Sequence, residues 1–265
     1  MNKRIFFCIF SIVTFTVFFL FSACNLRDSY SQKTTITIAA ASSLESVLTQ
    51  HILPMFIAKN PRITPEGVYH GSGWLQIQIE AGLNADVFFP ASMTQMDNLL
   101  RQGLIKEETI VPLLENRLVL IKPKGVFSEV TGFYNAHLAR SAALPDPQSV
   151  PAGKYAKEVF DSLGNWDIVS AGASFGTNVT QVLHWVAEAN AEIGVVYITD
   201  AALSERVKII EEAPPASLLR PIIYPVAILS GSPNKKEAEL FISFLLSEEA
   251  AAVFEASGFS IHSRH

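Results

Sequence analysis

Apolar and polar residues alternate along the chain in a pattern that predicts strands and helices in turn. The β-branched and apolar run 35–40 predicts a strand, and from Ser42 apolar residues follow at helical spacing as far as Phe56. The same order returns with a short strand predicted at 67–70, a glycine-rich turn, and a helix at 74–81. This alternation indicates an α/β architecture, for which we expect largely parallel sheets.

The same pattern continues to the C-terminal end of the chain. It predicts a loop at 145–153 and another at the Pro214-Pro215 pair. The remaining predicted elements are strands at 86–89, 117–122, 194–197 and 224–229, and helices at 93–102, 154–163, 179–189, 235–246 and 248–257.

The first residues form a segment of a different kind. Lys3 and Arg4 precede an almost purely apolar run over 5–23, the arrangement of an export signal. We therefore expect residues 1–24 to be a signal peptide and the polar stretch 25–33 to be a tether. Export directed by this signal peptide would place the rest of the chain outside the cytoplasm.

The end of this segment resembles a bacterial lipobox, in which a cysteine receives a lipid anchor. Small residues precede Cys24, although Phe21 stands where leucine is usual. Cys24 is therefore the expected lipidation site, which would hold the protein at the membrane. An uncleaved membrane helix and ordinary cleavage after Ala23 are the alternatives, and both also place the remainder outside the cytoplasm.

Composition narrows the class of protein. The chain has 265 residues, 49% of them hydrophobic, and a net charge of -5, which suits one large or two modest globular domains. Since nucleic-acid binding normally needs a basic face, no nucleic-acid partner is expected. Both cysteines, Cys8 and Cys24, lie in the N-terminal segment, so we expect no disulfide and no thiolate metal site in the body.

Several sequence blocks resemble the periplasmic molybdate-binding proteins of ABC transporters. They occur in the order of that family, from about Thr35 to Ile261, and together are more specific than any one block alone. The blocks are Ala39-Ala40-Ala41-Ser42-Ser43-Leu44, Gly71-Ser72-Gly73, Gln78-Ile79-Glu80-Ala81-Gly82, Ala85-Asp86-Val87-Phe88, the run from Asp146 to Ala156, Gly194-Val195-Val196-Tyr197 and Gly258-Phe259.

The resemblance implies the type II periplasmic-binding-protein fold, in which two α/β lobes enclose a ligand cleft. The chain would leave the first lobe near Asn116 and return near Tyr224. The first lobe would then comprise residues 34–116 and 225–265, and the second residues 117–224. We expect a monomer with no cofactor, in which closure of the lobes over the ligand is what a transporter would recognise.

The resemblance also implies five ligand-binding positions. Ser43 and Ser72 would each provide a hydroxyl and a backbone N–H, Ala152 and Val179 would each provide a backbone N–H at a helix start, and Tyr197 would provide its phenolic hydroxyl. The metal would enter as the molybdate or tungstate oxyanion, without direct protein ligands to the metal atom.

Helix N-termini suit such a ligand physically, because their unpaired N–H groups and positive dipole ends favour an anion. Fixed donors cannot follow a smaller tetrahedron inward, so sulfate should bind poorly. A site without an acceptor should also disfavour protonated phosphate. Three residues depart from the family pattern, namely Ser42 in place of alanine, Gly73 in place of a further serine, and the bulky Trp74.

These expectations define a solute-binding protein that delivers molybdate or tungstate to a membrane permease and catalyses no reaction. A binding protein for another oxyanion, such as sulfate, is a close alternative. An enzyme is the alternative of a different class, because Gly172-Ala173-Ser174-Phe175-Gly176 matches the G-x-S-x-G motif of serine esterases. Asp200 and His262 follow Ser174 in the order of such a triad, and Ile168-Val169 would provide the preceding strand.

Overall fold

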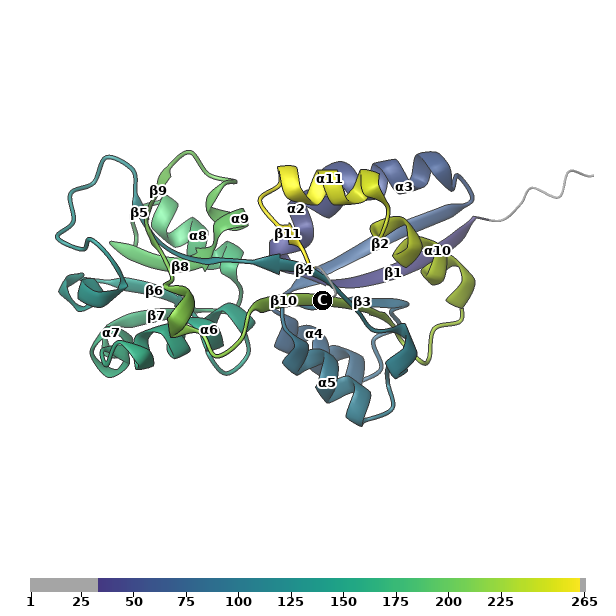
Figure 1. Cartoon of the computed structure of the whole chain (residues 1–265), viewed down its shortest axis with the longest axis horizontal. Coiled ribbons are helices and arrows are strands. Elements are labelled where there is room, and N and C mark those ends of the chain that lie inside the picture. The colour runs from purple at the N-terminus through teal and green to yellow at the C-terminus, as the bar shows by residue number, and fades with distance from the viewer. Residues whose placement is uncertain (1–32, 263–265) are drawn as a thin grey trace, which may run out of the picture. The chain divides into compact units, whose positions relative to one another are not determined.

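The computed structural model describes residues 33–262, which form two lobes that are each built on one mixed β-sheet (Figure 1). The first sheet has the strand order β11-β4-β10-β3-β1-β2, and the second has the order β7-β6-β8-β5-β9. The first sheet consists of β1 (Thr34–Ala41), β2 (Ile63–His70), β3 (Val87–Phe89), β4 (Val111–Asn116), β10 (Ile222–Ile228) and β11 (Ser260–Ile261). The second consists of β5 (Leu118–Pro123), β6 (Ala142–Pro145), β7 (Ala173–Gly176), β8 (Ile193–Tyr197) and β9 (Val207–Glu212).

Helices cover both sheets, and in the first lobe α3 and α11 lie on the opposite side of the sheet from α4 and α5 (Figure 1). The helices of the first lobe are η1 (Ser42–Leu44), α2 (Glu45–Val47), η2 (Leu48–Ile52), α3 (Leu53–Lys59), α4 (Ser72–Glu80), α5 (Met93–Arg101), η3 (Glu107–Thr109), α10 (Lys235–Leu245) and α11 (Glu248–Ala256). Those of the second lobe are η4 (Phe133–Leu138), α6 (Pro151–Ser162), α7 (Trp166–Ala171), α8 (Val179–Ala187), α9 (Ile198–Ala201) and η5 (Pro215–Ser217).

The chain crosses between the sheets at two places. Arg117 alone separates β4 of the first sheet from β5 of the second, and the segment from β9 through η5 leads back to β10. β10 begins at Ile222, close to the predicted return point. The division of the chain into lobes by residue number stays a prediction, while the two-lobe α/β fold is confirmed.

The expectation of largely parallel sheets is wrong. β1 pairs in parallel with β2 and β3, and β6 pairs in parallel with β7 and β8. The strands at the crossing are antiparallel to their neighbours, because β4 and β10 traverse the first sheet in opposite directions and β5 runs against both β8 and β9. Right-handed crossover helices produce only the parallel half of each sheet.

Two helices of the second lobe differ from their predicted bounds. α6 starts at Pro151, three residues before the predicted start, because proline at the first helical position loses no hydrogen bond there. Ile168 and Val169 belong to the helix α7 and not to a strand. Within this lobe the sequence pattern also missed β6, β7 and β9, which are short or carry several exposed residues.

The apolar core follows the two faces of the sheets. One cluster extends through both lobes and contains the largest buried aromatic side chains, among them Phe56, Phe133, Phe160 and Phe241. A smaller cluster lies between the first sheet and the helices α4 and α5. The strand β1 contributes alternate side chains to the two clusters, Ile38 to one and Ala39 to the other, as a strand covered on both faces should.

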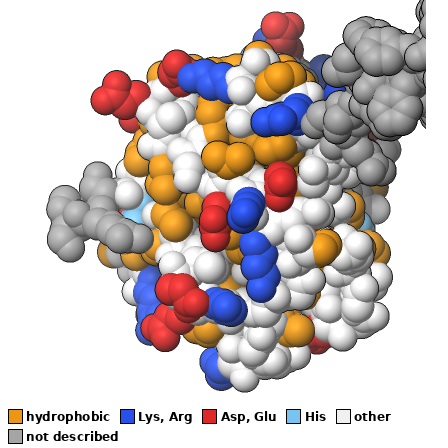
Figure 2. Space-filling view, turned by 90° about the vertical axis from the view of Figure 1, so that its right-hand side faces the viewer, with side chains coloured by type: hydrophobic (Ala, Val, Ile, Leu, Met, Phe, Trp, Pro, Cys, Tyr) orange, Lys and Arg blue, Asp and Glu red, His pale blue; other side chains and the backbone are white. Residues whose placement is uncertain are grey.

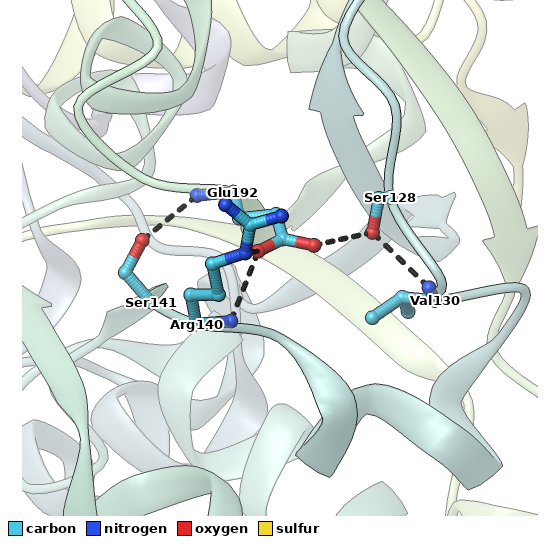
Figure 3. A network of polar contacts seen from close by, with 5 residues as sticks. All are labelled: Ser128, Val130, Arg140, Ser141 and Glu192. Carbon is cyan, nitrogen blue, oxygen red and sulfur yellow. Dashed lines mark hydrogen bonds and ion pairs between the residues drawn. The ribbon is translucent and has the colours of Figure 1, made fainter.

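The partly buried acidic side chain of Glu192 ties the long β5–β6 connection to the second sheet (Figure 3). The Glu192 carboxylate accepts hydrogen bonds from the Ser128 hydroxyl at 2.7 Å and from the Arg140 N–H at 2.9 Å. The backbone N–H of Glu192 donates to the Ser141 hydroxyl at 3.1 Å. These bonds fix both ends of the loop onto the start of β8, the strand that carries Tyr197.

The end of the first lobe that faces the viewer in Figure 2 carries acidic and basic side chains interspersed with apolar ones. Within residues 33–262, no helix is long and apolar enough to cross a membrane. The predicted signal peptide and Cys24 lie outside the described residues.

Candidate functional site

The glycine-rich turn Gly71-Ser72-Gly73, at the start of α4, lies directly against the second lobe. The N–H of Gly73 donates to the carbonyl oxygen of Ser149 at 3.0 Å. A Cβ atom at Gly73 would lie 2.3 Å from that oxygen, and one at Gly71 would lie 2.6 Å from the carbonyl oxygen of Thr177. The turn is therefore seated between the residues that precede α6 and α8, and glycine is needed there for this close approach.

Four helix N-termini meet around this turn. Ser72 is the first residue of α4, Ala152 is the second residue of α6, and Val179 is the first residue of α8. Ser43 lies in η1, which packs against α8 of the other lobe. Because the first N–H groups of a helix have no partner within it, the fold directs several unpaired donors and several positive dipole ends toward one region.

All five predicted ligand residues are buried, none more than 5% exposed. The serine, alanine and valine positions lie at the helix starts just described, and Tyr197 ends β8 in the second lobe. The fold thus brings these elements of both lobes together at the interlobe contact. That these particular residues bind a ligand stays a prediction.

The Ser72 hydroxyl has one acceptor position occupied by the backbone. Its oxygen accepts the N–H of Ala91 at 3.0 Å, so its own proton remains available to another acceptor. The Ser43 hydroxyl lies 3.0 Å from the hydroxyl of Tyr224, where either oxygen could be the donor.

The hydroxyl of Tyr197 is a buried polar group without a hydrogen-bond partner among the described residues. The Tyr197 ring packs against Tyr224 with the centroids 5.6 Å apart. Burial raises the pKa of Tyr197 well above its ordinary value, and the neighbouring Tyr224 adds to this shift. The hydroxyl therefore stays protonated and can donate a hydrogen bond to a ligand that carries acceptors only.

Two of the three residues that depart from the family pattern, Gly73 and Trp74, fit this geometry. Gly73 cannot be a serine because a Cβ would overlap the Ser149 carbonyl oxygen. The Trp74 side chain stacks on His70 at 4.4 Å and is 40% exposed. Nδ1 of His70 accepts the N–H of Gly71 at 2.8 Å, so the stacked pair supports the turn from outside.

Asp200 is a buried acidic residue whose role the sequence pattern did not reveal. Its carboxylate accepts the N–H of Tyr197 at 3.1 Å, three residues earlier, which is the spacing of a capping box at the start of α9. Burial raises the pKa of Asp200 from 3.8 to about 7, and the hydrogen bond from Tyr197 opposes part of that shift. Below pH 7, a largely protonated Asp200 adds little negative charge beside an anion site.

The raised pKa of Asp200 predicts a pH dependence of stability. The folded protein retains this proton up to about pH 7, whereas the unfolded chain releases it near pH 4. The free energy of unfolding should therefore fall by a few kcal/mol as the pH rises through this window. Asp200→Asn should remove that part of the slope, since asparagine can still accept the Tyr197 N–H. Urea unfolding of both proteins at several pH values measures the difference, and equal slopes would contradict the prediction.

The structure does not assemble the esterase triad. Ser174 lies in β7, an edge strand of the second sheet, and not in a turn between a strand and a helix. Asp200 is engaged with Tyr197, and His262 contacts the Glu115 carboxylate at 2.6 Å at the edge of the first sheet. In residues 33–262, no group of three or more His, Cys, Asp or Glu side chains could hold a metal ion.

The fold and the interlobe arrangement of helix starts define a solute-binding protein of the two-lobe class. The chain belongs to the family of bacterial extracellular solute-binding proteins, which matches residues 36–260. Membership in this family places the protein outside the cytoplasm.

Individual relatives support the resemblance seen in the sequence. The chain is 38% identical over 252 residues to the putative ABC transporter substrate-binding lipoprotein YvgL of Bacillus subtilis, covering 94% of this chain and 96% of that one. It is 34% identical over 241 residues to the molybdate-binding protein ModA of Haemophilus influenzae, covering 89% and 94%. The solved substrate-binding domain of a putative molybdenum ABC transporter from Clostridium difficile is 33% identical, with a TM-score of 0.67 and coverage of 87% and 100%.

Proposed function

We propose that the protein is the solute-binding component of an ABC importer and captures molybdate or tungstate between its lobes for delivery to a membrane permease. Two observations carry this proposal: helix N-termini from both lobes meet beside the glycine-rich turn, and the buried Tyr197 hydroxyl has no partner among the described residues. Neutral donors and positive dipole ends without acceptors are what a fully deprotonated oxyanion requires. The relatives named ModA bind molybdate, which supports the same ligand here.

The proposed donors are sufficient in number. Two serine hydroxyls, four backbone N–H groups and the Tyr197 hydroxyl make about seven donors, and hydrogen bonds to charged groups contribute about 1.5–3 kcal/mol each. After the costs of desolvation and ordering, a net of roughly -8 to -12 kcal/mol corresponds to micromolar to nanomolar affinity. No side chain of opposite charge is required, and the protein performs no reaction on the ion.

Calorimetric titration of the purified protein with molybdate, tungstate, sulfate and phosphate tests this function. Molybdate and tungstate should bind in the micromolar range or tighter, and sulfate and phosphate about a hundredfold more weakly. Ser43→Ala and Ser72→Ala should each weaken molybdate binding about tenfold or more through the lost donor. Tighter binding of sulfate would favour the alternative oxyanion, and unchanged affinity in both variants would count against these two residues.

We also propose that Cys24 carries a lipid anchor and that the protein acts as a monomer. The lipobox-like residues before Cys24 support the anchor, as does a relative described as a substrate-binding lipoprotein. Cells fed a radiolabelled fatty acid should label the protein, and Cys24→Ala should abolish the label and release the protein from the membrane fraction. A labelled Cys24→Ala variant would contradict this assignment.

A further inference from the structure

A chain of hydrogen bonds with a defined direction leads from the strand crossing to Ser43. It starts at the backbone N–H of Arg117, which donates to Oδ1 of Asn116 at 2.8 Å. Because a backbone N–H can only donate, this contact fixes which end of the Asn116 amide is the acceptor. Nδ2 must then be the donor on the other side, where it contacts Thr199 Oγ1 at 2.9 Å and Tyr224 Oη at 3.2 Å.

The next step of the chain is the Tyr224 hydroxyl. Tyr224 is fully buried, and its oxygen already accepts a hydrogen bond from the Asn116 amide, so its own proton needs an acceptor within the protein. Among the described residues, the Ser43 oxygen at 3.0 Å is the acceptor within hydrogen-bond distance. The Tyr224 proton therefore points to Ser43, and the Ser43 proton is left to point away from Tyr224.

The Ser72 oxygen also accepts a hydrogen bond within the protein, in this case directly from the backbone N–H of Ala91. In both serine hydroxyls that we assign to the site, one acceptor position is thus occupied within the protein, and the proton is left free to be donated to a ligand. The difference between them is that Ser72 is fixed by the backbone, whereas Ser43 depends on a side chain that can be replaced.

We propose that Tyr224 is a positioning residue that fixes the Ser43 proton toward the bound anion and so makes the site reject oxyanions that carry a proton. This inference rests on the proposed function. A site of donors alone leaves a protonated anion oxygen without an acceptor, which is costly in a buried site. A serine hydroxyl that is free to turn can accept that proton instead, so release of Ser43 should reduce the discrimination.

Selenate and hydrogen arsenate form a suitable pair of probes. They are tetrahedral dianions of nearly equal size, and at mildly alkaline pH only the arsenate carries a proton. Each is titrated against the full-length protein, directly or in competition with molybdate. Tyr224→Phe keeps the ring contacts with Tyr197 and Phe259, at 5.6 Å each, and removes only the hydroxyl. The ratio of selenate affinity to arsenate affinity should fall about tenfold in this variant.

A double-mutant cycle with Ser43→Ala separates positioning from a general structural effect. Tyr224→Phe should change the ratio in the presence of Ser43 and leave it unchanged when Ser43 is alanine. Thr199→Val is the matched control, because it removes one Asn116 contact without touching the Tyr224–Ser43 pair, and its ratio should equal that of the unaltered protein. Asn116→Ala releases Tyr224 in turn and should shift the ratio in the same direction, which provides a second test where Tyr224→Phe fails to fold.

The affinity ratio and its dependence on Ser43 decide the test. A fall of the ratio that depends on Ser43 supports the proposal. An unchanged ratio in Tyr224→Phe or Asn116→Ala, with molybdate binding retained, overturns the role of Tyr224 and leaves the proposed function intact. Absence of molybdate and tungstate binding to the unaltered protein overturns the proposed function itself.

Discussion

Replacement of Gly73 by alanine should weaken molybdate binding by about ten- to a hundredfold and leave the two lobes folded. The added Cβ would lie 2.3 Å from the Ser149 carbonyl oxygen of the other lobe, and the hydrogen bond from the Gly73 N–H to the same oxygen would be disturbed. Forced overlap of this kind costs about 1–3 kcal/mol. Because the overlap arises where the lobes meet, the cost falls on closure rather than on the folding of either lobe.

Calorimetry gives the affinity, and small-angle scattering with saturating molybdate should show a less closed molecule. Gly172→Ala is the matched control, since a Cβ at Gly172 meets no atom within 4 Å and its backbone φ of -106° suits any residue. That variant should bind as the unaltered protein does. If Gly73→Ala binds equally well, the contact between the glycine turn and Ser149 is not needed for closure.

The sequence was sufficient for the features that depend on local pattern or on family blocks. The buried strand β1 and the helix that starts near Ser42 follow from a run of apolar residues and its change of period. The block Gly71-Ser72-Gly73 could also be recognised from the sequence. Backbone carbonyl oxygens of the second lobe approach both glycines so closely that a larger residue would overlap them. Relatives at more than 30% identity confirm the family that these blocks indicated.

Other features depend on contacts between segments that are distant in the sequence. The antiparallel crossing strands follow from the chain passing twice between lobes, which no local pattern records. Asn116 and Tyr224 meet across 108 positions, and only the folded chain shows that the Asn116 amide connects the crossing to Ser43. Asp200 carried a weak signal, since its spacing from Tyr197 is that of a capping box, but its burial is a tertiary property.

Neutral donors and the hydrogen bonds around them explain how a weakly acidic protein can hold a dianion. The groups assigned to the anion are neutral, and the surrounding hydrogen bonds decide where their protons point. Burial keeps the Asp200 carboxyl largely protonated below pH 7, so it adds little repulsion. Fixed neutral donors of this kind respond to the size and the protonation of the ligand more than to its charge alone.

Replacement of Tyr197 by phenylalanine should separate ligand affinity from stability. The variant keeps the ring contact with Tyr224 and loses a buried hydroxyl that has no partner among the described residues. Loss of one donor to a charged ligand should weaken molybdate binding about ten- to a hundredfold. The free energy of unfolding without anion should not decrease, and should rise by up to about 1–3 kcal/mol where the hydroxyl is buried unpaired.

Calorimetry and urea unfolding of the same samples, with and without molybdate, measure both quantities. Tyr134→Phe is the control, because the Tyr134 side chain is 76% exposed in the second lobe and its loss should change neither value. A Tyr197→Phe variant that is less stable without anion would show that the hydroxyl is hydrogen-bonded within the protein. Unchanged affinity would show that it does not reach the anion. Opposite signs for the two effects would identify the Tyr197 hydroxyl as a group whose only favourable partner is the ligand.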